Sequence, residues 1–386
     1  MEKKFESNQS KYEYQREVFH RIISPQPTVI AIEGGPCSGK TTLLNELGRI
    51  SENYPRPIIL IPEVATEHLA NLAQSGIEFV NLMNNDHPAF IEFETNILRS
   101  IIEAISTAKD QYAGSDAIIV VDRVDIKPYL SHKDFELIKQ SLDLSVSPVL
   151  GMADKIIYLP TVAKTSSETY EALVATNSTR YEDADQAIAT CDRNLASASI
   201  NPEFSVYADH DFQTRIDNAL HDILNPEQET ETKFKCIDDI DFSQCQNQIG
   251  NLTKQYLNRI DIYQSYHQID EIDYRLRRGK IADQYFYHLA IKQGEGETRR
   301  ELRRNLSEEE YKTLYRGPHI IERNQHKTRF RYLFEFEDRN YILALDFNQI
   351  SYTFSIEIEG MNHEKAKHIK IPGFVIDGLQ EPNLVQ

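Results

Sequence analysis

Residues 30–47 constrain the fold most, because they join a strand, a tight turn and a helix in one short segment. They read IAIEGGPCSGKTTLLNEL. The apolar, β-branched run before Gly34 predicts a buried strand, and the leucines at positions 43, 44 and 47 recur with helical spacing. Gly34, four further residues and then Gly39-Lys40-Thr41 match the pattern of a loop that cradles phosphates between a strand and a helix.

Such a loop binds phosphate oxygens through backbone N–H groups and the helix N-terminus. Lys40 would reach the β- and γ-phosphates, and Thr41 would supply a ligand to Mg²⁺. The alternative is a glycine-rich turn that only caps a helix. We expect ATP or GTP, with Mg²⁺ as cofactor, to bind at Gly34, Gly35, Pro36, Cys37, Ser38, Gly39, Lys40, Thr41 and Thr42.

Further apolar runs at 57–63, 117–122 and 155–160 alternate with helical patterns, which predicts an α/β fold with a parallel sheet covered on both faces. Charged residues end two of these runs, where parallel sheets bind ligands. We expect Asp122 to hold Mg²⁺ and Arg123 to face phosphate or substrate. Glu63 would be a base or a substrate-binding carboxylate. The alternatives are a turn-capping Asp122 and a solvated, helix-capping Glu63.

The segments GGPCSGKTT, IPEVAT, VVDRVD and NSTRYEDADQAIATCD occur in this order. Residues 28–224 thereby resemble the AAA-type P-loop family related to nicotinamide riboside kinase, and more widely nucleoside and nucleotide kinases. The resemblance implies that 177–192 forms a lid, in which Arg180 closes on the transferred phosphate. Asn177, Glu182 and Asp192 inherit candidate roles. The family commonly has Gly where this chain has Val124, so we expect an altered acceptor side.

The alternation of strands and helices stops near residue 225, where the sequence becomes acidic and rich in turn residues. We predict a linker over 225–250. Strictly alternating strands follow, which indicate a separate α+β domain of mainly antiparallel strands. The predicted organisation is a helical extension at 1–27, a P-loop kinase-like domain at 28–224, the linker, and an antiparallel barrel domain at 251–386.

Basic residues recur at every second position in these later strands, so they would share one face. If the sheet closes, that face lines a tunnel suited to a triphosphate, a polyphosphate or another phosphorylated small molecule. The alternative is an ordinary solvated face of an open sheet. The candidate polyanion-binding residues are Arg275, Arg277, Lys292, Arg300, Lys327, Arg329 and Arg331, and the acids on later strands are Asp346, Glu357 and Glu359.

The series YRLRR, AIKQGEGETRRELRRNLSEEEY, KTRFRYLFEFEDRNYILALDF and IEIEG makes residues 252–377 similar to the CYTH domain of adenylate cyclase and thiamine triphosphatase relatives. The resemblance implies a tunnel barrel that binds triphosphates. CYTH enzymes open with a Glu-x-Glu-x-Lys strand that holds the catalytic metal. The apparent counterpart, NLTKQYL, offers Asn251, Thr253 and Gln255 instead. A divalent metal in the barrel would then have to be held by Asp346, Glu357 and Glu359 alone, and we expect the barrel to bind its ligand without efficient turnover.

The formal net charge of −18 argues against broad binding to nucleic acid. We see no apolar run long enough to span a membrane and no apolar core of a secretory signal, so we expect a cytoplasmic protein. The favoured function is a Mg²⁺-dependent P-loop phosphotransferase or NTPase coupled to a polyanion-binding barrel. The alternatives are a nucleotide-switched binding protein for a phosphoinositide or polyphosphate, and a CYTH-type triphosphatase. The sequence leaves the choice of ATP or GTP, the acceptor and the oligomeric state open.

Overall fold

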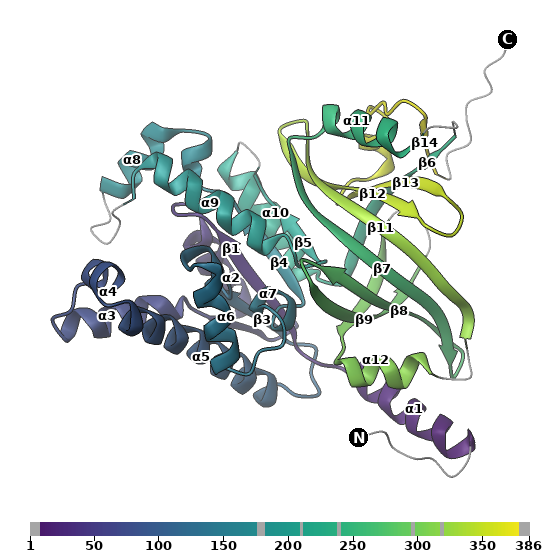
Figure 1. The fold of residues 1–386 in the computed structure, drawn as a ribbon, viewed down its shortest axis with the longest axis horizontal. Coiled ribbons are helices and arrows are strands. Elements are labelled where there is room, and N and C mark those ends of the chain that lie inside the picture. The colour runs from purple at the N-terminus through teal and green to yellow at the C-terminus, as the bar shows by residue number, and fades with distance from the viewer. Residues whose placement is uncertain are drawn as a thin grey trace. The chain divides into compact units, whose positions relative to one another are not determined.

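The computed structural model describes residues 8–175, 182–208, 211–237, 241–294, 298–316 and 320–377 (Figure 1). The chain divides into two compact units. One unit is Ser24–Pro226, and the other combines Met1–Ile23 with Glu227–Gln386. Among the described helices, none has both the length and the apolar character that crossing a bilayer requires.

The unit Ser24–Pro226 alternates strands with helices, as its apolar pattern predicts. Its strands are β1 Thr28–Gly34, β2 Ile58–Ile61, β3 Ile118–Asp122, β4 Lys155–Leu159 and β5 Phe204–Val206. Its helices are α2 Lys40–Ser51, α3 Val64–Gln74, α4 Phe79–Asn85, α5 His87–Gln111, α6 His132–Ser141, α7 Pro148–Gly151, α8 Ser167–Ala175, α9 Ala184–Ala198 and α10 Phe212–Leu224, with 3-10 turns η1 Lys127–Tyr129 and η2 Val162–Lys164.

The strands of this unit form a parallel sheet in the order β2-β3-β1-β4-β5 within the described residues. Ile30 and Ile32 on one face of β1 pack with Leu43 of α2 and Ile216 of α10. On the other face, the Tyr158 hydroxyl of β4 donates to the Cys191 carbonyl of α9, at 2.6 Å. Helices thus cover both faces, and the predicted parallel α/β sheet is confirmed.

The second unit is built mainly from long antiparallel strands. Its strands are β6 Gln228–Cys236, β7 Gln255–Ile269, β8 Ile272–Ile281, β9 Gln284–Gln293, β10 Thr298–Asn305, β11 Ile320–Phe336, β12 Arg339–Asn348, β13 Thr353–Glu359 and β14 Phe374–Ile376. Its helices are α1 Asn8–Ile23, α11 Phe242–Leu252, α12 Glu308–Tyr315 and α13 His363–Ala366.

Strands pair in the order β10-β9-β8-β7-β11-β12-β13-β6, and β10 also pairs with β6, which closes the described strands into an eight-stranded antiparallel barrel. The short β14 pairs with the end of β6. Apolar side chains pack outside the barrel wall: one cluster joins Leu276 and Leu289 to α12, and another joins Ile356 and Ile358 to α11. The predicted antiparallel barrel is confirmed, and its charged side chains face inward.

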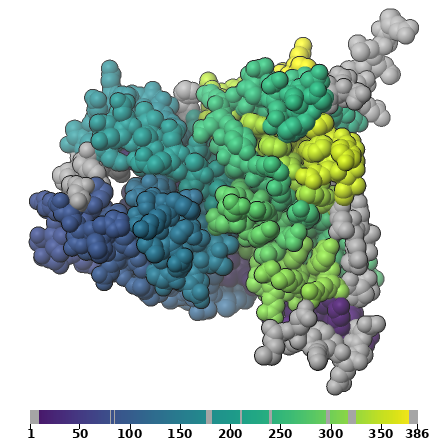
Figure 2. Space-filling view, viewed as in Figure 1, coloured from purple at the N-terminus to yellow at the C-terminus, as the bar shows by residue number. Residues whose placement is uncertain are grey.

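The expected linker at 225–250 requires correction, because it contains β6 and most of α11. Thr230, Thr232 and Phe234 of β6 alternate with charged residues, and the strand pairs with β13 and β10. The polar composition reflects inward-facing charges rather than an unstructured connection. The N-terminal helix likewise packs within the barrel unit, where Phe19 and Ile22 contact the same apolar cluster as Leu276. Figure 2 shows this helix, in purple, against the green surface of the barrel unit.

Candidate functional site

The loop between β1 and α2 adopts a conformation that its glycines make possible. Gly34 has φ 151°, and a Cβ there would lie 2.0 Å from the Leu159 carbonyl oxygen. Gly39 has φ 95°, and a Cβ there would lie 2.8 Å from the Phe212 ring. Lys40 opens α2, and its ammonium donates to the carbonyl oxygens of Gly34 and Gly35, each at 3.4 Å. Its ammonium therefore lies against the cradle, as the motif predicts.

Three of the predicted site residues lie together at the carboxyl ends of β2 and β3. Asp122 is the last residue of β3. Arg123 follows with a positive φ of 72°, and its N–H donates to the Ile32 carbonyl at 3.1 Å. Its Nη1 lies 3.3 Å from Oε1 of Glu63, and its guanidinium lies 5.1 Å from the centre of the Tyr129 ring. A left-handed backbone at a non-glycine residue costs free energy, and such strain often accompanies functional sites.

Glu33 holds the turn after β3 in place, a role that the sequence analysis missed. Its Oε1 accepts hydrogen bonds from the backbone N–H groups of Val124 at 2.7 Å and Asp125 at 3.0 Å. Burial and the nearby Asp125 raise the pKa of Glu33 above its ordinary value. The sequence did offer a signal for this role, because Glu33 is the one acid in the otherwise apolar segment IAIEGG. Val124, the departure from the family pattern, is completely buried.

Asp122 has the chemistry of a magnesium ligand. It is 7% exposed, and its Oδ1 has no hydrogen-bond partner among the described residues. Burial raises its pKa, while the Lys40 charge lowers it. Burial also lowers the pKa of Lys40, which feels the charges of Arg123, Asp122 and Glu63. Mg²⁺ is bound in proteins by carboxylate oxygens, so an unsatisfied oxygen at this place fits the ion. Thr41 is the second residue of the adjacent helix α2 and is exposed.

A pocket of about 150 Å³ opens beside Asp122 and Arg123. Two of the carboxylates around it come from different elements, because Glu63 precedes α3 and Glu94 lies in α5. Most of its wall is apolar or aromatic. The lining residues are Glu63, Val64, Ala65, Leu69, Phe79, Phe93, Glu94, Ile97, Ile101, Asp122, Arg123, Ile126 and Tyr129.

The predicted lid falls partly outside the described residues. Arg180 and Asn177 lie outside the described residues, so their roles remain predictions. Glu182 is described, and its Oε1 accepts a hydrogen bond from the Thr190 hydroxyl at 2.9 Å. Asp192 pairs with the Lys164 ammonium at 2.6 Å.

The interior of the barrel carries charges from strands throughout its wall. Arg277 of β8 lies opposite His288 of β9, and Ala344 of β12 lies opposite Glu357 of β13. Following this register around the barrel places cations and fewer acids on the same inner face. These residues are Lys233, Arg275, Arg277, Lys292, Arg299, Arg303, Lys327, Arg329 and Arg331, with Glu229, Glu231, Glu301, Asp346, Glu357 and Glu359.

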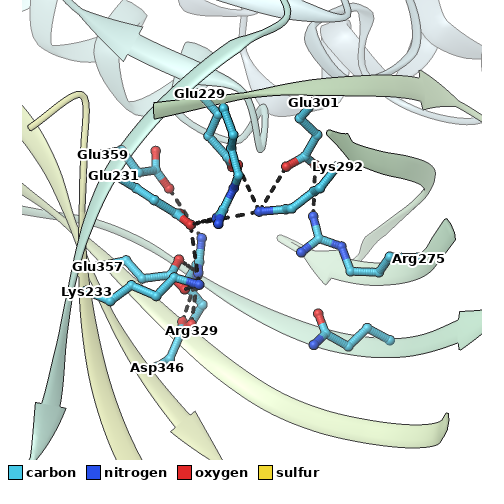
Figure 3. A network of polar contacts seen from close by, with 12 residues as sticks. Glu229, Glu231, Lys233, Arg275, Lys292, Glu301, Arg329, Asp346, Glu357 and Glu359 are labelled. Carbon is cyan, nitrogen blue, oxygen red and sulfur yellow. Dashed lines mark hydrogen bonds and ion pairs between the residues drawn. The ribbon is translucent and has the colours of Figure 1, made fainter. Parts of the chain in front are cut away.

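Arg329 binds all three acids that were predicted as metal ligands (Figure 3). It pairs with Asp346 at 2.7 Å, with Glu357, and with Glu359 at 3.3 Å. Lys327 also pairs with Asp346. The positive charges hold the pKa of Glu357 well below its usual range despite burial. These acids therefore fix the orientation of Arg329 in the structure.

One predicted cation faces away from the tunnel. Arg300 is exposed on the outer face of β10, whereas Arg299 and Arg303 face inward. The sequence reasoning took the wrong register for this strand. Arg299 pairs with Glu229 at 3.1 Å, and Arg303 pairs with Glu301 at 2.8 Å.

The expected loss of the opening acids is also corrected. Strand β6 reads Gln-Glu-Thr-Glu-Thr-Lys from residue 228, so Glu229, Glu231 and Lys233 form a Glu-x-Glu-x-Lys series. All three line the barrel interior, where Lys233 pairs with Glu231 and Glu357, each at 3.3 Å (Figure 3). The spacing was visible in ETETKFK, but its acidic surroundings led to the linker prediction.

The inner acids are mixed with cations rather than gathered by themselves. Among the described residues, no group of three or more acid, His or Cys side chains is placed to hold a metal. In contrast, Arg277 has an unsatisfied buried Nε, and the Nδ1 of His288 also has no partner within the described chain. Burial together with Arg277 and Arg275 lowers the pKa of His288 to about 3, so its ring is neutral. The described interior thus offers unused hydrogen-bonding groups on its cationic side.

The glycine-rich loop, the parallel sheet and the strand-end carboxylates define a P-loop nucleotide-binding domain. Residues 29–215 match the family model for an AAA domain, which is P-loop-like. A search of curated proteins found no match.

Solved structures resemble part of the chain at low identity. A protein from Pyrococcus horikoshii OT3 is 20% identical, with a TM-score of 0.28, over 36% of this chain and 81% of that one. A Hippeastrum protein studied as an adenylyl cyclase, with a dominant triphosphatase activity, is 14% identical, with a TM-score of 0.29, over 40% and 92%. An inorganic triphosphatase is 20% identical, with a TM-score of 0.23, over 38% and 83%. At these TM-scores the matches carry no argument about activity.

Proposed function

We propose that the AAA domain transfers the terminal phosphate of a magnesium-bound nucleoside triphosphate to a small acceptor. The observation that carries the proposal is the 150 Å³ pocket whose wall includes Asp122, Arg123 and Glu63. The electrostatic coupling of Lys40 to these same three residues supports a shared site. A domain that only hydrolysed nucleotide would not need an apolar pocket at this place.

Phosphoryl transfer depends mainly on positioning and on neutralising charge. Lys40 and the loop N–H groups would bind the β- and γ-phosphates, and Asp122 and Thr41 would hold the metal. Bound Mg²⁺ would neutralise charge on the phosphate oxygens. Arg123 would lie near the transferred group, and Arg180 stays a prediction for closing over it.

The reaction would exchange one bond to phosphorus for another. An acceptor hydroxyl oxygen bonds to the γ-phosphorus as the bond to the β–γ bridging oxygen breaks, leaving a nucleoside diphosphate. The hydroxyl proton passes to a base, for which Glu63 is the candidate. Its carboxylate lies 3.3 Å from Arg123, which holds it beside the pocket where a base would have to lie.

Product analysis tests this proposal. Purified protein is mixed with Mg-ATP or Mg-GTP and a panel of nucleosides, and products are separated by chromatography. We expect a phosphorylated nucleoside, and Lys40→Ala should remove it while the exposed-surface control Lys133→Ala should not. Slow hydrolysis without any phosphorylated acceptor would contradict transfer and favour the nucleotide-switched binding protein.

A second candidate function belongs to the barrel, which we propose binds and hydrolyses a triphosphate. The observation that favours it is the inward-facing series Glu229, Glu231 and Lys233, opposite a wall of arginines. Carboxylates there would bind a metal ion that arrives with the triphosphate, and the cations would bind phosphate oxygens. Polyphosphate or phosphoinositide binding without hydrolysis remains the alternative.

Inorganic tripolyphosphate and Mg²⁺ test the barrel. We expect phosphate release that Glu231→Gln abolishes and that the exposed control Glu309→Gln retains. Tripolyphosphate binding by calorimetry without phosphate release would support the binding alternative and contradict hydrolysis.

A further inference from the structure

The pocket beside Arg123 contains one carboxyl group whose chemistry the proposed transfer does not use. Glu94 lies in the N-terminal half of α5, between Phe93 and Thr95, and lines the pocket. Its side chain is buried, with 6% of the residue exposed. The rest of that wall, which includes Phe79 and Ile97, is largely apolar.

Glu94 has no partner within the described part of the chain. No hydrogen bond reaches its carboxyl group and no cation pairs with it at contact distance among these residues. Arg123 acts on it only through its charge, while burial raises the pKa of Glu94 to about 7. Buried polar groups are nearly always hydrogen-bonded, because leaving one unsatisfied costs free energy. A ligand is the natural source of the missing partner.

The size of the pocket limits what that ligand places there. A cavity of about 150 Å³ lined by apolar side chains can hold a benzene-sized ring. Phe79 and Phe93, whose ring centres lie 5.5 Å apart, provide aromatic surface for such a ring. The strand ends with Glu63 and Asp122 form another part of the wall, where an attached hydroxyl group would meet the phosphate.

We propose that the acceptor carries its hydroxyl on a scaffold whose ring enters this pocket and donates a hydrogen bond from a ring amino group to the Glu94 carboxyl. The inference rests on the phosphotransferase function proposed above and names its acceptor class. A phosphate acceptor with a carbonyl group at the same ring position would instead place one hydrogen-bond-accepting oxygen against another when Glu94 is ionised. Glu94 is thus a specificity-determining residue.

Two matched pairs of nucleosides test the proposal, because the members of each pair differ in an amino or a carbonyl group at one ring position. They are cytidine with uridine, and adenosine with inosine. Each is titrated into the full chain by calorimetry, and each is assayed for phosphorylation with Mg-ATP and Mg-GTP. In the wild type, at least one amino member should bind and react about tenfold or more better than its carbonyl partner.

Glu94→Gln replaces the carboxyl group with an amide that can also donate. This substitution should remove or reverse the preference for the amino member of a pair, chiefly by changing KM. Glu94→Leu should remove it without reversing it. Glu92→Gln, on the exposed face of the same helix, is the matched control and should keep the wild-type preference. If Glu94 had a purely structural role, its substitution would instead lower the binding and phosphorylation of both nucleosides in a pair equally.

The outcomes separate the inference from the function on which it rests. Phosphorylation without an amino preference, or with one that Glu94→Gln leaves unchanged, overturns the inference and leaves the transferase intact. Binding that prefers amino rings and depends on Glu94, but without phosphorylation, supports the inference and contradicts transfer. If none of the four nucleosides is bound and none is phosphorylated, the inference is overturned, because these rings fit its stated chemistry.

Discussion

Arg329 and Asp346 face one another across β11 and β12 and form a bidentate pair, with Nε to Oδ1 at 2.7 Å and Nη2 to Oδ2 at 2.8 Å. The same guanidinium also binds Glu357 and Glu359. One buried cation therefore organises two buried carboxylates and the partly exposed Glu359. Fork-shaped pairing of this kind fixes geometry as well as charge.

Removing that cation should destabilise the barrel strongly. Arg329→Met would leave the buried Asp346 and Glu357 with only Lys327 and Lys233 paired to them among the described residues, and would remove a partner of the partly exposed Glu359. Breaking a buried charge network by removing one partner costs about 3–5 kcal/mol. Urea unfolding monitored by circular dichroism should show this loss for the barrel unit.

Arg300→Met is the matched control for the previous change, because Arg300 is exposed on the outer face of β10. It should change the free energy of unfolding by no more than about 0.5 kcal/mol. Equal effects of the two substitutions would show that the inner network does not stabilise the barrel.

Gly34→Ala should disrupt the phosphate loop. A Cβ at this position would lie 2.0 Å from the Leu159 carbonyl oxygen, and φ is positive. We expect a loss of more than about 1 kcal/mol in the free energy of unfolding, together with loss of nucleotide binding by calorimetry. Gly48→Ala, within α2 and with its nearest Cβ contact at 3.7 Å, should instead be neutral or stabilising by up to about 1 kcal/mol. Unchanged nucleotide binding by Gly34→Ala would contradict the loop assignment.

The stability of the AAA domain should fall as pH rises through the titration of Glu94. Burial raises the pKa of Glu94 from about 4.5 to about 7, so between these values the folded state keeps a proton that the unfolded chain releases. The free energy of unfolding then falls with increasing pH, by at most about 1.4 kcal/mol per pH unit from this group. Stability that Glu94 contributes below pH 4.5 is lost as pH passes 7.

Glu94→Gln cannot ionise, so it should lose less stability than the wild type between pH 5 and pH 7, about the window set by the shift of Glu94. Urea titrations at several pH values measure the difference. Glu92→Gln should follow the wild-type curve. Parallel curves for wild type and Glu94→Gln would mean that Glu94 has an ordinary pKa in the folded protein.

The phosphate loop could be predicted from the local pattern of the sequence. Its glycines, Lys40 and the start of the following helix all lie within residues 34–42, so no distant part of the chain was needed to predict its strand-loop-helix structure. The strand-end residues Asp122, Arg123 and Glu63 were also predicted, because parallel strands bring their carboxyl ends to one edge. The structure places them around one pocket.

Features that depend on distant pairing were missed. Strand β6 looks like a polar linker until β13 and β10 pair with it and turn Glu229 and Glu231 inward. The preference of a segment for strand depends on such neighbours rather than on its own composition. Glu94 fits the polar part of a helical pattern, and its burial depends on the other elements that pack against α5, among them α3 and α4. The sequence also could not show that Arg299 and not Arg300 faces the barrel interior, because this depends on the pairing of β10 with β9.

The central claim is that the chain has two phosphate sites with separate chemistries, a nucleotide site at Lys40 and a triphosphate site at Glu231. The most direct measurement assays both reactions, transfer from Mg-ATP or Mg-GTP to a nucleoside and phosphate release from tripolyphosphate, in wild type, Lys40→Ala and Glu231→Gln at equal folded concentration. We predict that each substitution lowers its own reaction by about a hundredfold or more and leaves the other within about twofold. Loss of both reactions in Lys40→Ala, or of neither in either variant, would contradict the claim.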